Sequence, residues 1–322
     1  MKLGILMDPL HKLKPYKDST VAMIQSAQAK GWECEYFTPQ DVYCEHGQAY
    51  ANTSKIRVID EHLANWATST PVGGKPLVDF DIILMRKDPP FDMEYIYSTY
   101  ALDLAAQAGV LIANNPQTLR DANEKFFTLH FPQCCPETLV SSDMQRLHQF
   151  WEHHRNVIFK PLDGNGGASI FHVQDDGHNL VVILETLTNQ QTTTIMAQTF
   201  IKEIAHQGDK RILLINGEPV EYGLARIPAP GEVRGNLAAG GTGKVVPLTE
   251  RDRWICSQLA PTFKAKGLYF VGIDVIGDYL TEINITSATC IREIVAETGL
   301  DIAGDFLEAL EQVYKSRATS RG

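Results

Sequence analysis

The chain has 322 residues and a mass of 35.8 kDa, a length that predicts about two domains. Lysine and arginine number 29 against 39 aspartates and glutamates, so the net charge is −10 and the pI lies near 5.5. This acidic balance argues against a non-specific nucleic-acid-binding protein, and hydrophobic and charged fractions of 44% and 21% exclude a disordered chain.

No membrane or export signal is predicted. The longest apolar runs fall short of the ~18 residues that a membrane span needs. Asp8 and Pro9 interrupt the N-terminal apolar stretch before a signal-peptide core is complete. The six cysteines form no CxxC pair and no metal-ligand spacing, which is typical of reduced thiols. We therefore expect a cytoplasmic protein with no membrane or nucleic-acid partner.

Strand and helix patterns alternate over the first third of the chain. Short apolar runs predict strands at Leu3–Met7, Trp32–Phe37, Phe80–Met85 and Val110–Ala113. Helical spacing followed by a closing glycine predicts helices at Ser19–Lys30 and Glu94–Ala108. Alternating strands and helices indicate a parallel sheet with helices on both faces, so residues 1–122 are predicted to form a doubly wound α/β domain.

The rest of the chain, from about Ala122–Asn123, has a different pattern. Strand candidates come first, at Val157–Lys160, Ser169–Val173, Ile195–Phe200, Arg211–Ile215 and Val220–Ile227. Asn216-Gly217 is a strong signal for a two-residue hairpin turn. Amphipathic helices are predicted at Thr249–Lys266 and Asp301–Tyr314. This order predicts an α+β half with a largely antiparallel sheet.

A glycine-rich segment follows a lysine at the end of one predicted strand. Lys160 precedes Gly164-Asn165-Gly166-Gly167, and glycines let backbone N–H groups approach an anion closely. The lysine could then add a point charge to the same phosphates. A flexible hairpin with a solvated lysine is the alternative. A Rossmann-type dinucleotide loop is disfavoured because a strand follows, not a helix.

Oxygen-bearing side chains cluster near the end of the predicted sheet. Asp274 lies inside an apolar strand, and Glu282 and Asn284 share one face of the next strand by the two-residue period. Such ligands suit Mg²⁺, and a strand with a solvated face is the alternative. The register between the two strands distinguishes the metal site from the solvated strand. A two-residue turn at Gly277-Asp278 sets Asp274 opposite Thr281, whereas a three-residue turn sets it opposite Glu282, as the metal hypothesis requires.

The same register reasoning concerns two arginines. With a turn at Asn216-Gly217, Arg211 is expected to pair with Tyr222, and Arg226 then points from the same face. Two guanidinium groups on one face repel each other unless an anion lies between them, which indicates a phosphate or carboxylate site. Structural ion pairs with Asp209 or Glu221 are the alternative.

Together these segments resemble the ATP-grasp carboxylate–amine ligases, and within them the prokaryotic glutathione synthetases. The resemblance rests on the blocks Leu84–Phe91, Asn123–Lys125, Lys160–Ser169, Arg226–Pro228, Arg234–Gly241 and Thr281–Arg292. It implies an N-terminal α/β domain followed by an ATP-grasp fold, with limits at 1–122, 123–201 (lid), 202–316 (catalytic) and a tail at 317–322. ATP would lie between the last two domains.

The resemblance also implies roles for individual residues. On the nucleotide side these are Lys125, Lys160, Gly164, Asn165, Gly166 and Gly167 for the phosphates, Gln198, Thr199, Phe200 and Ile201 for adenine, and Asp209 near the ribose. Two Mg²⁺ or Mn²⁺ ions would be held by Asp274, Glu282 and Asn284. The substrate side would use Asp8, Arg86, Arg226, Arg234, Gly235, Asn236 and Arg292, with Arg211 and Arg226 as the catalytic pair.

The implied reaction joins γ-glutamylcysteine to glycine. The acid is first converted to an acyl phosphate by ATP, and the amine of glycine then displaces phosphate. The composition of Ile227–Thr242 is typical of a loop that closes over such an intermediate. An ATP-grasp ligase with another acid or amine, and a catalytically silent nucleotide-binding protein, are the alternatives. A homo-oligomer, dimer or tetramer, is expected.

Overall fold

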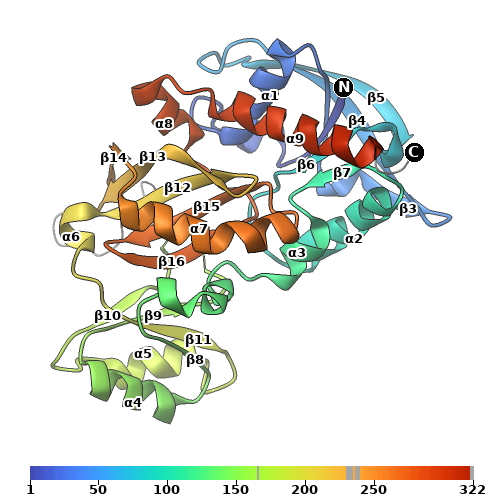
Figure 1. Ribbon diagram of the computed structural model, residues 1–322. Helices are drawn as coiled ribbons and strands as arrows, with labels where there is room; N and C mark the ends of the chain where they lie inside the picture. The colour runs from blue at the N-terminus through green and yellow to red at the C-terminus, as the bar shows by residue number, and fades with distance from the viewer. Residues whose placement is uncertain (165–166, 230–234, 236–239, 320–322) are drawn as a thin grey trace.

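The computed structural model describes residues 1–164, 167–229, 235 and 240–319, and within these it contains three β-sheets (Figure 1). We refer to them as the N-terminal sheet (β1 to β7), the small sheet (β8 to β11) and the C-terminal sheet (β12 to β16). Figure 1 shows the C-terminal sheet between the other two.

The N-terminal sheet is built on four parallel strands, in the order β2-β1-β6-β7. Their bounds are Lys2–Leu6 (β1), Glu33–Phe37 (β2), Ile82–Met85 (β6) and Leu111–Ala113 (β7). The connecting helices α1 and α2 (Ser19–Ala29 and Met93–Gln107) begin where Asp18 and Asp92 accept backbone N–H bonds. The predicted α/β domain is confirmed.

Three antiparallel strands that the sequence did not predict extend this sheet. β3 (Val42–Glu45) and β5 (Ala67–Pro76) both pair with β4 (Gln48–Val58). β5 is largely exposed and consists of small and polar residues with two glycines and two prolines. Its composition therefore lacks the apolar alternation by which a strand is predicted from sequence.

The small sheet has the order β10-β9-β11-β8 and its own core. The strands are Thr138–Ser141 (β8), Val157–Pro161 (β9), Phe171–Val173 (β10) and Ile195–Thr199 (β11). Helices α4 and α5 (Met144–His154 and Leu180–Leu187) contribute to this core, for example through Leu147 and Leu184. The small sheet and its helices α4 and α5 therefore pack around a hydrophobic core of their own.

The C-terminal sheet is entirely antiparallel, in the order β14-β13-β12-β15-β16. The strands are Asp209–Ile215 (β12), Glu218–Ile227 (β13), Thr242–Pro247 (β14), Phe270–Ile276 (β15) and Tyr279–Asn284 (β16). The accompanying helices are α7 (Glu250–Ala265), which opens with a Thr249–Asp252 capping box, α8 (Ile291–Thr298) and α9 (Ile302–Thr319).

Short helices fill the connections. They are α3 (Pro116–Asp121), α6 (Ile204–Gln207) and 3₁₀ turns at Leu10–Lys12, Pro39–Asp41, Leu77–Asp79, Phe126–His130 and Pro132–Cys134.

The N-terminal and C-terminal sheets share two hydrophobic cores, one on each face. One core joins α1, α8 and α9 to both sheets, for example through Ile5 and Leu213, and α1 and α9 lie side by side in Figure 1. The other core joins α2 and α7 to both sheets, for example through Ile83 and Ile273. The two sheets therefore form one continuous packed body.

Asn114, immediately after β7, bridges the two sheets by hydrogen bonds. Its buried amide nitrogen donates to the carbonyls of Phe270 and Ile285, both at 2.8 Å. Its amide oxygen accepts the backbone N–H groups of Tyr269 and Phe270 at 2.7 and 2.9 Å. The full hydrogen-bonding capacity of this side chain is thus used to tie the N-terminal sheet to β15 and the end of β16.

Candidate active site

A cavity, here the first cavity, opens between the small sheet and the C-terminal sheet. Most of the residues predicted on the nucleotide side line it: Lys125, Lys160, Gly164, Gly167, Gln198, Thr199, Phe200, Ile201 and Asp209. Asn165 and Gly166 lie outside the described residues. The apolar part of the wall includes Ile158, Ile170, Ile204 and Ile276, which the sequence did not single out. A flat apolar ring could be enclosed by this wall, with polar groups at one end.

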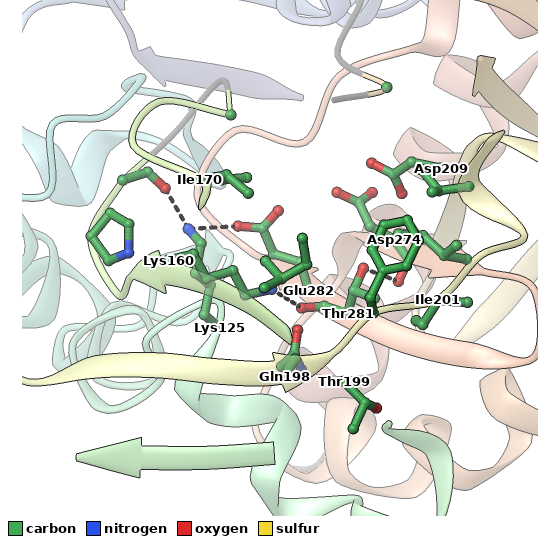
Figure 2. A pocket seen from close by; sticks show the side chains of 18 of the residues that line it. Lys125, Lys160, Ile170, Gln198, Thr199, Ile201, Asp209, Asp274, Thr281 and Glu282 are labelled. Carbon is green, nitrogen blue, oxygen red and sulfur yellow. Dashed lines mark hydrogen bonds and ion pairs between the residues drawn. The ribbon is translucent and has the colours of Figure 1, made fainter. Parts of the chain in front are cut away.

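Two lysines converge on the polar end of the first cavity (Figure 2). The Nζ atom of Lys125 lies 3.0 Å from Oε1 of Glu282 and also donates to the carbonyl of Gly164. The Nζ atom of Lys160 donates to the carbonyl of Thr281 at 3.3 Å. Burial lowers the pKa of Lys160 to about 8.

The segment that carries Lys125 is fixed by its two predecessors. Asn123 Oδ1 accepts the backbone N–H groups of Lys125 and Phe126 at 3.1 and 2.9 Å, which fixes the chain just before the 3₁₀ turn at Phe126–His130. The half-buried Glu124 accepts three hydrogen bonds at Oε1, two from the backbone N–H groups of Ile285 and Thr286 and one from the Thr286 hydroxyl, at 2.8, 3.0 and 2.9 Å. Glu124 therefore joins Lys125 to the end of β16.

Asp274 and Glu282 lie opposite each other on β15 and β16, but not for the reason expected. The turn has two residues, since Ile276 pairs with Tyr279, so the three-residue turn that the metal hypothesis called for is wrong. A β-bulge shifts the register: Val275 pairs with Leu280 and Asp274 with Glu282, and this leaves Thr281 as the extra residue. The Thr281 hydroxyl donates to the carbonyl of Asp274 at 3.1 Å, which supports the bulge.

Arg211 and Arg226 point from one face of the sheet, and their anion is a protein carboxylate. A bulge between Ile212 and Leu214 makes Arg211 pair with Leu224, so the expected pairing with Tyr222 is wrong. Because the shift is two residues, the two arginines still share a face. The alternative of a structural ion pair with Asp209 is confirmed for Arg226, and no ion pair of either arginine with Glu221 occurs among the described residues.

Asp274 is enclosed by nitrogen donors. Its two carboxylate oxygens lie 2.6 and 3.1 Å from Nε and Nη2 of Arg211, and Oδ1 lies 3.0 Å from Nη2 of Arg226. Arg226 also binds the carboxylate of Asp209. Burial alone would raise the pKa of Asp274, but the two guanidinium groups outweigh it and hold that pKa below its usual range. Burial raises the pKa of Asp209, against the effect of Arg226.

The donor set fits a hard divalent cation. Glu282 lies opposite Asp274, whose pKa the two guanidinium groups hold low, and Asn284 Nδ2 lies 3.2 Å from Asp274 Oδ2, so all three side chains meet on one face. Within the described residues, no group of three or more His, Cys, Asp and Glu side chains could hold a metal. Such an ion would therefore need further oxygen ligands from substrate, which is the usual arrangement for Mg²⁺ at phosphates.

A second cavity, of about 350 Å³, lies beside the N-terminal sheet. It is lined by Lys12, Leu13, Lys14, Lys17, Asp18, Asp88, Arg226, Thr289, Cys290 and Glu293. Arg226 lines this cavity and binds Asp209 and Asp274, which line the first one. The guanidinium of Arg226 therefore lies at the junction of the two cavities.

Three of the residues predicted on the substrate side bind other protein groups and do not line either cavity. Asp8 pairs with Lys87 at 3.1 Å, and the buried Arg86 donates to Thr20 Oγ1 and to the carbonyl of Ala288 at 3.1 and 2.9 Å. Arg292 binds Glu61 and Gln25 at 3.0 and 2.6 Å. None of Asp8, Arg86 and Arg292 is among the described residues that line the two cavities.

Gly235 lines the first cavity, whereas Arg234 and Asn236 lie outside the described residues. A Cβ atom at Gly235 would come within 2.4 Å of the carbonyl oxygen of Arg226, so only glycine fits this close approach. Most of the predicted lid between Ile227 and Thr242 also lies outside the described residues.

Comparison with known proteins agrees with this geometry. Residues 1–120 match the family model of the N-terminal domain of prokaryotic glutathione synthetase, and residues 124–299 match that of its ATP-grasp domain. The chain is 54% identical over 317 residues to the glutathione synthetase of Pseudomonas putida, covering 98% of this chain and 99% of the relative. It is 53% identical over 311 residues to that of Escherichia coli O6:H1, covering 97% and 98%.

Solved structures with low sequence identity share the fold. D-cycloserine synthetase DcsG aligns over 98% of this chain and 100% of its own, with a TM-score of 0.68 at 12% identity. The ATP-grasp ligase PsnB, in complex with minimal precursor, Mg and ADP, aligns over 98% of both chains, with a TM-score of 0.62 at 15% identity.

The family models and the relatives of more than 50% identity together identify the chain. The chain belongs to the prokaryotic glutathione synthetase family and is an ATP-dependent ligase of glutathione synthesis that uses a divalent metal.

Proposed function

We propose that the chain joins the cysteinyl carboxylate of γ-glutamylcysteine to the amine of glycine, and that the substrates are divided between the first and the second cavity. The observation that carries this proposal is the position of Arg226 between them. On one side lie lysines and glycines suited to phosphates, and on the other lie lysines suited to a small carboxylate-bearing acid. A group transferred from one cavity to the other would pass this guanidinium.

ATP occupies the first cavity in this proposal. Lys125, Lys160 and the backbone of Gly164–Gly167 hold the phosphates, and Gln198, Thr199, Phe200 and Ile201 surround adenine. Asp209 lies at the ribose. The support is that the described members of this set line one cavity, with cations at one end and the apolar wall at the other.

Asp274, Glu282 and Asn284 are proposed to hold two Mg²⁺ or Mn²⁺ ions together with oxygens of the nucleotide. When bound, such ions neutralise charge that develops on the transferred phosphoryl group. The lowered pKa of Asp274 and the shared face of the three side chains support this proposal.

The catalytic pair is Arg211 and Arg226. Phosphoryl transfer to a carboxylate needs positioning and charge neutralisation more than covalent help from the protein, and two planar guanidinium groups supply both. The bidentate contact of Arg211 with Asp274 keeps that arginine in place, so Arg226 is the one that can reach the acid in the second cavity. The acyl phosphate formed there is attacked by glycine, and water must be kept out.

Three further properties complete the proposal. The chain is divided at 1–122, 123–201 and 202–316, and the expected tail at 317–322 begins within the last turn of α9, which ends at Thr319. The chain is a homodimer or homotetramer, and it works in the cytoplasm. Nucleic acids are not among its partners. In the part of the chain that the structure describes, no helix has the length and apolar character to traverse a bilayer.

Product analysis tests the proposal. The purified chain is incubated with ATP, Mg²⁺, γ-glutamylcysteine and glycine, and ADP, phosphate and the peptide are quantified. Equal amounts of ADP and glutathione are expected. A ligation product only with another acid or amine would favour the alternative ligase, and nucleotide binding without ADP release would favour a silent binding protein.

A further inference from the structure

The second cavity contains charged groups with and without partners. Of its carboxylates, Asp18 caps α1 by accepting the N–H of Val21 at 2.9 Å. Asp88 accepts the hydroxyl hydrogen bond of Ser287 at 2.5 Å. Arg226 is held by Asp209 and Asp274. These three side chains therefore serve the architecture of the cavity before any ligand enters.

Glu293 differs from these groups. It lies in the first turn of α8, and neither a hydrogen bond nor an ion pair to it occurs within the described residues. Its Oε2 atom is buried and has no hydrogen-bond partner. A buried carboxylate oxygen is unfavourable unless a donor, best a cation, satisfies it.

The protein does not supply that cation from the same wall. Lys12, Lys14 and Lys17 line the cavity, yet no ion pair within 4.0 Å joins any of them to Glu293. The three lysines are exposed at the cavity rim, where they are available to anions. Among the residues that the structure describes, the cavity therefore combines a rim of cations that form no ion pair with one carboxylate in its wall that has no partner.

These charges complement those of the acid substrate. At neutral pH γ-glutamylcysteine carries two carboxylates and one α-ammonium group. The cysteinyl carboxylate must approach Arg226 for activation, which leaves the glutamyl end, with its carboxylate and ammonium, for the rest of the cavity. We propose that Glu293 binds the α-ammonium group of the γ-glutamyl residue and so selects an acid that bears an amine at this position. This assignment rests on the proposed function.

The test compares two substrates that differ only in the ammonium group, γ-glutamylcysteine and its deamino analogue glutarylcysteine, with saturating ATP, Mg²⁺ and glycine. We expect the wild-type enzyme to favour γ-glutamylcysteine in kcat/KM. In Glu293→Gln, kcat/KM for γ-glutamylcysteine is expected to fall roughly tenfold or more, mainly through KM, because the ion pair is lost. For glutarylcysteine it should be unchanged or improved.

Glu297→Gln is the matched control, because Glu297 is an exposed glutamate one turn further along α8. It should keep the wild-type preference, and both variants should keep the wild-type KM for ATP. Equal losses on both substrates in Glu293→Gln would overturn the assignment in favour of a structural role, and so would an unchanged preference. Failure of the wild type to ligate γ-glutamylcysteine and glycine would instead overturn the proposed function.

Discussion

The ammonium group of Lys125 lies 3.0 Å from Oε1 of Glu282, so a cation proposed to bind phosphate and a carboxylate proposed to bind metal are partners. Glu124 reinforces this pair, because it connects the segment of Lys125 to the residues after β16. A phosphate that binds Lys125 therefore competes with Glu282, and a metal ion that binds Glu282 competes with Lys125. Binding of either ligand releases the residue that binds the other.

Glu282→Gln should abolish turnover while the fold is retained. The amide keeps the size of the side chain but removes the charge that a divalent ion needs. Circular dichroism and the melting temperature check the fold, and steady-state ADP release checks activity. Glu308→Gln, at an exposed site on α9, serves as the control. Substantial activity of Glu282→Gln at ordinary Mg²⁺ concentrations would contradict the metal assignment.

Arg226→Lys should lower kcat by about a hundredfold, because lysine keeps the charge but loses the planar fork that spans Asp209, Asp274 and the acid. The exposed Arg253→Lys is the matched control. Steady-state kinetics with both substrates varied provides the measurement. If Arg226→Lys behaves like the wild type, Arg226 has only a structural role in holding the aspartates.

Nucleotide affinity should weaken as pH rises through 8. The buried Lys160 has a pKa lowered to about 8, so its cationic form prevails below that value and is lost above it. The protonated fraction falls from about one half at pH 8 to about one tenth at pH 9, so the Kd for ATP should rise about fivefold between these two values. Titrations at pH 7, 8 and 9 measure this. Lys160→Arg stays charged and should flatten the profile; the same slope in that variant would assign the titration to another group.

Thr281→Val should weaken metal-dependent activity, because the hydroxyl that bonds the carbonyl of Asp274 supports the bulge that aligns Asp274 with Glu282. Loss of this hydrogen bond costs about 0.5–1.5 kcal/mol. The Mg²⁺ concentration for half-maximal activity should increase several-fold in Thr281→Val and stay near the wild-type value in Thr281→Ser, which keeps the hydroxyl. Equal requirements in both variants would show that the hydroxyl does not set the register.

The sequence predicts the chemistry of the site better than its geometry. Residue type and the two-residue period identify Asp274, Glu282 and Arg211. The shared face of Arg211 and Arg226 survives the shift of two positions at Arg211, whereas the pairing of Asp274 with Glu282 depends on the one-residue bulge at Thr281. The bulges that set their actual register could not be predicted, since a bulge depends on tertiary hydrogen bonds such as that of Thr281. The same holds for β5, whose polar composition carries no strand signal.

The second cavity was the least predictable part of the site. The family resemblance assigns Arg292 to the substrate side, but Arg292 binds Glu61, while its neighbour Glu293 lines the cavity. Sequence spacing offered a signal, because Glu293 in the first turn of α8 lies three residues after Cys290, the residue that directly precedes this helix. The three lysines of the 12–17 segment offered another. Which face meets a cavity is decided by packing, and a single sequence does not reveal it.

The bridge made by Asn114 determines where the molecule can bend. Because this side chain and two shared cores join the N-terminal and C-terminal sheets, those sheets cannot move apart without losing buried contacts. The small sheet has its own core and meets them mainly at the first cavity. Any hinge motion must therefore displace the small sheet over a fixed base. The proposed nucleotide site would then close from the side of the small sheet, whereas the proposed acid site would keep its shape.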